Sequence, residues 1–163
     1  MSRIVSNSGP LIALAEIDRF PFLKQLFGKL SIPSAVYREV VVDGTGRPGA
    51  KETAEADWIK TVEVQDRLAV DLLRDELGPG QSEAIVLATE LSADYILLDD
   101  WKARRKARHL GLRVSGTLGV LLMAKASGLV KEVKPLLDQL RKTDFRMSSK
   151  VYQDVLAKAG ESP

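Results

Sequence analysis

The chain has 163 residues, enough for one domain with a full core, and its 45% hydrophobic and 28% charged residues are typical of a soluble globular protein. With no cysteine and a single histidine, it excludes disulfides, thiolate metal sites and multi-histidine zinc sites, which leaves oxygen ligands for Mg²⁺ or Mn²⁺. The net charge of +2 is too small to indicate nucleic-acid binding by itself. No signal pattern or long apolar span is visible, so we expect a cytoplasmic protein with no membrane association.

Short apolar runs alternate with helical patterns along the chain. In the first half, the pattern predicts, in order, a strand from residue 4, helices at 11–15 and 20–27, a strand at 30–32, a helix at 33–41, a loop at 43–49, a strand at 59–64, and helices at 66–77 and 82–91. In the second half, it predicts a strand that ends at Asp99, a basic helix to Leu110, a strand at 112–114, and helices at 116–126, 131–141 and 149–159. This alternation predicts a three-layer α/β fold with a mostly parallel sheet. We expect one domain over residues 1–163, with a core at about 3–145 and a C-terminal helix at about 148–159.

Two adjacent carboxylates, Asp99 and Asp100, directly follow the apolar run at residues 96–98. Such a run is typical of a strand buried on both faces of a parallel sheet, and ligands of open α/β sheets bind beyond the carboxyl ends of the strands. Successive strand side chains point to opposite faces, so we expect the two acids to differ in role. One would face the cleft, and the other would cap the helix that begins near Trp101.

Three further polar residues become relevant in such a fold. Asn7 follows the first strand, Glu39 lies on the helix expected at 33–41, and Glu83 lies in the first turn of the helix opened by Ser82. Each also has a structural explanation, because Asn7 suits a turn or cap, Glu39 suits a solvated surface, and Glu83 suits the positive end of a helix. Their meaning depends on whether the fold brings them together.

Five segments, taken in order, resemble a known family. They are residues 5–14, 32–40, 77–85, 97–100 followed by Ala103 and Arg104, and 116–119. The chain is similar to the PIN-domain ribonucleases, and in particular to a compact branch related to the VapC-type toxins of toxin–antitoxin pairs. The resemblance spans nearly the whole chain. It implies a three-layer α/β/α PIN-like fold, a Mg²⁺ or Mn²⁺ cofactor, an RNA substrate, a homodimer and an antitoxin partner.

The resemblance also implies which residues form the site. The catalytic positions match Asn7, Glu39, Glu83, Asp99 and Asp100, and the metal ligands match Asn7, Glu39, Glu83 and Asp100, with Asp99 as the rival to Asp100 or as a cap. The chain departs from the family at Asn7, where a catalytic PIN domain usually has Asp. An amide oxygen still coordinates a cation, but one negative charge is missing from the site.

Substrate contacts are expected from Ser8, Arg104, Arg105 and Thr117. Ser8 would bind a metal-bound water or the phosphate, or would instead cap a helix. Thr117 begins a helix whose free N–H groups could hold a phosphate, or it simply caps that helix. Arg104 and Arg105 belong to the basic helix, which would follow the RNA backbone or only form a solvated face.

The spacing of the basic helix predicts its orientation in the fold. Trp101, Ala103, Ala107 and Leu110 would form its buried stripe and would leave the cations outward. His109 would be a surface residue or helix-end partner. Aromatic residues make up only 6% of the chain, too few to indicate a base-stacking platform.

Two functions of different classes follow. The first is a metal-dependent endoribonuclease that hydrolyses RNA phosphodiester bonds, as the toxin of a toxin–antitoxin pair; the retained acids favour it. The second is a catalytically weak PIN-like module that binds RNA or protein; Asn7 favours it. A phosphatase with an aspartyl nucleophile fits poorly, because no Asp-x-Asp-x-Thr pattern follows the first strand.

Overall fold

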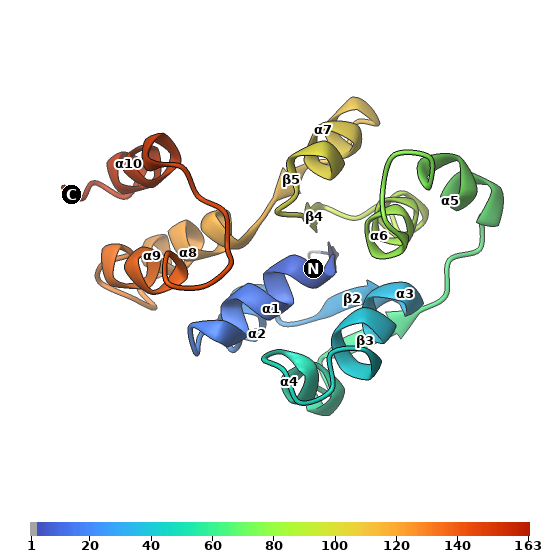
Figure 1. Cartoon of the computed structure of the whole chain (residues 1–163), viewed down its shortest axis with the longest axis horizontal. Coiled ribbons are helices and arrows are strands. Elements are labelled where there is room, and N and C mark those ends of the chain that lie inside the picture. Colours follow the sequence, from blue (N-terminus) through green and yellow to red (C-terminus); the bar gives the residue numbers. More distant parts are fainter. Residues whose placement is uncertain (1–2) are drawn as a thin grey trace.

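A computed structural model describes residues 3–163 and shows a five-stranded parallel sheet with helices on both faces (Figure 1). The strand order is β3-β2-β1-β4-β5. The strands are β1 (Ile4–Ser6), β2 (Leu30–Pro33), β3 (Ile59–Val62), β4 (Tyr95–Leu97) and β5 (Val114–Ser115). The three-layer α/β/α fold with a parallel central sheet is therefore confirmed.

The helices follow the predicted order closely. They are α1 (Ser8–Glu16), α2 (Phe22–Phe27), α3 (Ser34–Tyr37), the π-helical segment η1 (Arg38–Val42), α4 (Ala50–Glu55), α5 (Arg67–Leu73), α6 (Pro79–Glu90), α7 (Trp101–His109), α8 (Thr117–Ala126), α9 (Lys134–Leu140) and α10 (Ser149–Lys158). The short helix α4, which follows the expected loop at 43–49, was not predicted. No helix within residues 3–163 is long and apolar enough to cross a membrane.

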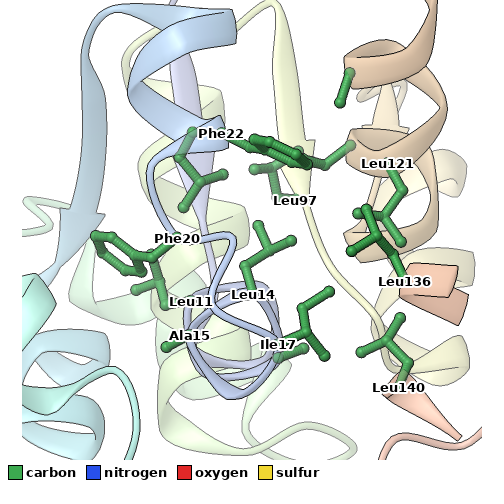
Figure 2. Close-up of a cluster of buried hydrophobic side chains, with 14 of the residues drawn as sticks. Leu11, Leu14, Ala15, Ile17, Phe20, Phe22, Leu97, Leu121, Leu136 and Leu140 are labelled. Atoms are coloured by element: carbon green, nitrogen blue, oxygen red, sulfur yellow. The ribbon is translucent and has the colours of Figure 1, made fainter. Parts of the chain in front are cut away.

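The core is divided by the sheet into two clusters of buried side chains. Leu97 of β4 packs in one cluster with Leu11 and Leu14 of α1 and with Leu121 of α8, as Figure 2 shows. Its neighbour Ile96 packs in the other cluster, which α6 and α7 cover. Adjacent residues of one strand thus enter different clusters, which confirms that β4 is buried on both faces.

Helix α6 begins earlier than its sequence pattern predicts. Pro79 occupies the first helical position, where a proline needs no hydrogen-bond partner for its nitrogen, and the Gly78 N–H donates to Gln81 Oε1 at 3.2 Å. Glu83 therefore lies in the second turn of the helix and not in the first. This places its carboxylate beside α3 and not at the free end of the helix.

The predicted buried stripe of α7 is only half right. Ala103 and Ala107 are fully buried, but Trp101 is 64% exposed and Leu110 is 52% exposed. At 3.6 residues per turn, Trp101 lies about 200° around the helix from Ala103, so both residues cannot face the sheet. Leu110 lies beyond the last turn. The indole of Trp101 consequently stands on the outward face of α7.

Candidate active site

Glu39 is held where three distant segments meet. The Ser8 hydroxyl, in the first turn of α1, donates to Glu39 Oε1 at 2.6 Å. The Gly80 N–H, in the first turn of α6, donates to Glu39 Oε2 at 3.2 Å. A Cβ at position 80 would collide with the Glu39 carboxylate, so only glycine allows this approach. Glu39 is thus a fixed acid beside the start of α1 and not a freely solvated surface residue.

Asn7 connects the end of β1 to α1 and has an unpaired oxygen. Its N–H donates to the Leu97 carbonyl at 3.0 Å, which fastens β1 to β4 at the carboxyl edge of the sheet. The residue is 7% exposed, and its Oδ1 has no hydrogen-bond partner among residues 3–163. Buried acceptors without partners are rare and costly, so this oxygen is suited to accept a ligand. Asn7 precedes the first residue of α1, Ser8, so the expectation that Ser8 itself caps the helix is wrong.

Asp99 connects the end of β4 to the start of α8. The Thr117 N–H donates to Asp99 Oδ1 at 2.8 Å, and the Thr117 hydroxyl donates to Oδ2 at 2.6 Å. A Cβ built on Gly9 would lie 3.3 Å from Asp99 Oδ2. Since Ser8 contacts Glu39 and the next residue lies against Asp99, the start of α1 stands between these two acids.

Arg104 organises the backbone behind Asp99. Its Nη1 donates to the carbonyl of Leu98 at 2.6 Å and to that of Ser115 at 2.9 Å, which ties the ends of β4 and β5 together. Burial raises the pKa of the Asp99 carboxyl, and the hydrogen bonds from Thr117 and the charge of Arg104 offset part of that rise. Burial lowers the pKa of Arg104. The Arg104 guanidinium thus donates to two backbone carbonyls, whereas the N–H and the hydroxyl of Thr117 donate to the Asp99 carboxylate.

Asp100 caps α7, because its Oδ2 accepts the Ala103 N–H at 2.9 Å. The expectation that one of the two adjacent acids caps the helix after β4 is confirmed, because Asp100 accepts the Ala103 N–H while Asp99 accepts from Thr117. The alternative expectation, in which Asp99 caps α7, is wrong. Asp100 is exposed, and no other hydrogen bond to its carboxylate is found within residues 3–163, whereas both oxygens of Asp99 are engaged by Thr117.

Glu83 has partners for both of its oxygens. Oε1 accepts the Ala35 N–H at the start of α3 at 3.0 Å, and Oε2 accepts Nη1 of Arg67 at 2.9 Å. The hydrogen bond and charge of Glu83 raise the pKa of the exposed Arg67 guanidinium. The pair lines a polar cavity of about 360 Å³ together with Ser34, Arg38 and Glu63. Sequence reasoning did not single out Arg67, because nothing local to Glu83 indicates it.

The predicted site residues thus form separate contacts along one edge of the sheet. Ser8 joins Glu39, Thr117 joins Asp99, Arg67 joins Glu83, and Asp100 belongs to α7. In the described part of the chain, no three carboxylate or histidine side chains gather into a group that could hold a metal ion. Arg105 lies elsewhere, over the ring of Trp101 on the outward face of α7.

Comparison with known proteins gives a family and a fold. Residues 3–161 match the family described as the PIN domain. Among solved structures, the chain is similar to a PilT N-terminus domain protein from the hyperthermophilic archaeon Sulfolobus solfataricus, with a TM-score of 0.51 and 18% identity over 76% of this chain and 93% of that one. At this identity the likeness shows the fold alone. No curated protein matches the chain.

Proposed function

Because the chain belongs to the PIN-domain family, whose members are generally nucleases, we propose that it is a metal-dependent endoribonuclease that hydrolyses RNA phosphodiester bonds. The observation that carries this proposal is the unpaired, buried Oδ1 of Asn7 next to Ser8, the residue that fixes Glu39. It provides an unused oxygen donor at the carboxyl edge of the sheet, where α/β folds bind their ligands.

The donor chemistry of these residues fits Mg²⁺ or Mn²⁺. The family resemblance assigns Asn7, Glu39, Glu83 and Asp100 as ligands, but no three acids gather within residues 3–163. One or two of these carboxylates, with the amide oxygen of Asn7, would therefore hold the ion, which is all that magnesium requires of a protein. When bound, the ion neutralises charge on the scissile phosphate and makes a water nucleophilic near neutral pH. Asp100 is favoured over Asp99 as the ligand, since its Oδ1 carries no hydrogen bond within residues 3–163, whereas Thr117 engages both oxygens of Asp99. Both oxygens of Glu83 are engaged as well, so Glu83 is the weakest of the four proposed ligands.

The chain's own residues then divide the remaining work. Ser8 and Gly80 fix the Glu39 carboxylate, and Thr117 and Arg104 fix the end of β4 from which Asp100 extends. Arg67 pairs with Oε2 of Glu83, and the Ala35 N–H holds its Oε1, so this carboxylate is fixed beside α3. These are positioning roles, whereas direct substrate contact is proposed for Arg105.

A second candidate function is a catalytically weak module that binds RNA or protein. Two observations favour it: Asn7 replaces the usual first acid, and Arg67 occupies a carboxylate oxygen of Glu83. The toxin role, an antitoxin partner, a homodimer and a cytoplasmic location remain proposals that the family resemblance suggests.

The test is cleavage of single-stranded RNA by the purified protein with Mg²⁺ or Mn²⁺. We expect wild type to cleave, Asp100→Asn to lose more than about 100-fold in rate as an essential metal ligand would, and Asp99→Asn to lose less. Asp154→Asn, on the exposed face of α10, is the matched control and should cleave as wild type does. Cleavage that survives both Asp100→Asn and Asp99→Asn would show that this edge of the sheet is not the active site.

A further inference from the structure

The outward face of α7 combines an exposed indole with a row of cations. Trp101 stands one residue after Asp100, and 64% of its surface is open to solvent. The Arg105 guanidinium lies over its ring, 5.7 Å from the centroid. A cavity of about 390 Å³ lies at this face, and its lining residues are Glu76, Trp101, Lys102, Arg105, Lys106 and His109.

The spacing of these residues along α7 explains why they share one face. Trp101, Arg105 and His109 follow each other at intervals of four residues, which align along one side of a helix. Ala103 and Ala107 occupy the opposite side and are fully buried against the sheet. These two alanines face the core, and Arg104 turns inward to the ends of β4 and β5. Trp101, Lys102 and Arg105 are exposed on the outward face.

Most of the positive charge on this face is not neutralised by the protein. Lys106 pairs with Glu76 at 3.2 Å, but Lys102 and Arg105 form no salt bridge with any residue between 3 and 163. The face therefore presents a flat aromatic ring next to cations that the protein leaves without acidic partners. An acidic ligand with a flat apolar part would satisfy both features.

We propose that this face is a subsite for one unpaired nucleotide of a single-stranded RNA. The base stacks on Trp101, and the adjoining phosphates contact Lys102 and Arg105. Aromatic stacking with a cationic track is how proteins bind single strands without reading sequence, whereas a duplex keeps its bases stacked inside. The inference rests on the proposed function for the identity of the ligand. It adds that the RNA must be single-stranded where it passes Asp100.

The subsite is tested by equilibrium binding of a short labelled single-stranded RNA in EDTA, so that no metal and no cleavage is involved. Trp101→Ala should weaken binding about 5- to 100-fold, and Trp101→Phe should retain most of the affinity, since one stacked base contributes on this scale. Tyr95→Ala is the matched control, because Tyr95 is a 37% exposed aromatic residue at the opposite, amino end of β4. It should bind as wild type does.

Salt dependence tests the phosphate contact separately. Lys102→Ala should reduce the slope of log affinity against log salt by about 0.7, the value expected for one phosphate contact with a single strand. Lys150→Ala, on the exposed surface of α10, should leave the slope unchanged. An unchanged slope for Lys102→Ala would overturn the phosphate contact.

Three results for Trp101→Ala would overturn the subsite. The variant could bind single-stranded RNA with full affinity, or it could lose as much affinity for duplex RNA as for single-stranded RNA. It could also lose affinity only for an acidic protein and not for RNA. Trp101 is exposed, so both of its variants should unfold at the wild-type temperature. The outcome is separate from that of the proposed function. If the wild-type protein binds RNA through Trp101 but never cleaves it, the nuclease proposal is refuted and the subsite proposal stands. If Trp101→Ala cleaves RNA with an unchanged KM, the subsite proposal is refuted and the nuclease proposal stands.

Discussion

Three consecutive residues at the start of α1 organise the candidate site. Asn7 presents its unpaired oxygen, the Ser8 hydroxyl holds Glu39, and Gly9 leaves room for Asp99. A side chain larger than hydrogen at position 9 would come within 3.3 Å of the Asp99 carboxylate. The short segment from 7 to 9 therefore lies between Glu39 of η1 and Asp99, which follows β4.

Asn7→Asp tests the role of the missing charge. If Asn7 occupies the first-acid position, a carboxylate there should raise the affinity for Mn²⁺ by about tenfold or more and increase the cleavage rate, because a charged ligand binds a hard cation more strongly than an amide does. Titration calorimetry with Mn²⁺ measures the affinity independently of cleavage. Without metal, the variant should unfold at a lower temperature, since the new charge is buried without a partner. Unchanged Mn²⁺ affinity would argue against this position as a ligand.

At the scale of elements, the close approach of α6 to η1 depends on Gly80. Glycine inside a helix is usually less stable than alanine by about 1 kcal/mol, so Gly80→Ala would stabilise an ordinary helix. Here a methyl group would displace the Glu39 carboxylate from its hydrogen bonds with Ser8 and Gly80, which contribute about 1 kcal/mol each. We therefore expect Gly80→Ala to lower the free energy of unfolding by about 1 kcal/mol instead of raising it. Urea denaturation measures this change.

A double variant separates the collision from any other effect of the alanine. In a Glu39→Ala background the obstructing carboxylate is gone, and Gly80→Ala should then be neutral or stabilising. If the effects of the two substitutions on the free energy of unfolding are additive, Glu39 and position 80 are not coupled. The contact between them is then not the reason that position 80 requires glycine.

At the scale of the whole molecule, the strand order explains why the candidate site residues, far apart in sequence, come to one edge of the sheet. Strand β1 stands between β2 and β4, so the chain leaves β1 toward one side of the sheet and later adds β4 on the other. A crevice opens at such a switch point beyond the carboxyl ends of the strands. Asn7 follows β1 and Asp99 follows β4, so residues 92 positions apart along the chain lie at the carboxyl ends of neighbouring strands.

The C-terminal segment is fastened to the body of the protein by Glu161. Its carboxylate accepts hydrogen bonds from Lys125 Nζ at 2.8 Å and from the N–H groups of Val133 and Lys134 at 2.8 and 3.0 Å. Burial alone would raise the pKa of Glu161, but these hydrogen bonds outweigh burial and hold the pKa below its ordinary value. The residue therefore joins the end of the chain to α8 and to the start of α9.

A depressed pKa determines how this contact responds to acid. The stabilisation from Glu161 is present above the ordinary pKa of a glutamate and is lost as the pH falls through the lower pKa of the folded protein. Glu161→Gln should thus unfold more easily than wild type near neutral pH, and the difference should shrink as the solution is acidified below about pH 4. Urea denaturation across this range measures it. A difference independent of pH would mean that charge at Glu161 is not what holds the segment.

The sequence by itself determined the chain order of the strands and of every helix except α4, the parallel sheet, the burial of β4 on both faces and the position of the acids beyond strand ends. These properties depend on apolar periodicity and on turn residues, which act over a few neighbouring positions. Only the tertiary structure decided that Arg67 pairs with Glu83, that Ser8 and Gly80 hold Glu39, and that Asp100 and not Asp99 caps α7. It also decided that Trp101 faces solvent, because the side of α7 that meets the sheet is set by packing, and a helix pattern with few apolar residues does not specify that side alone.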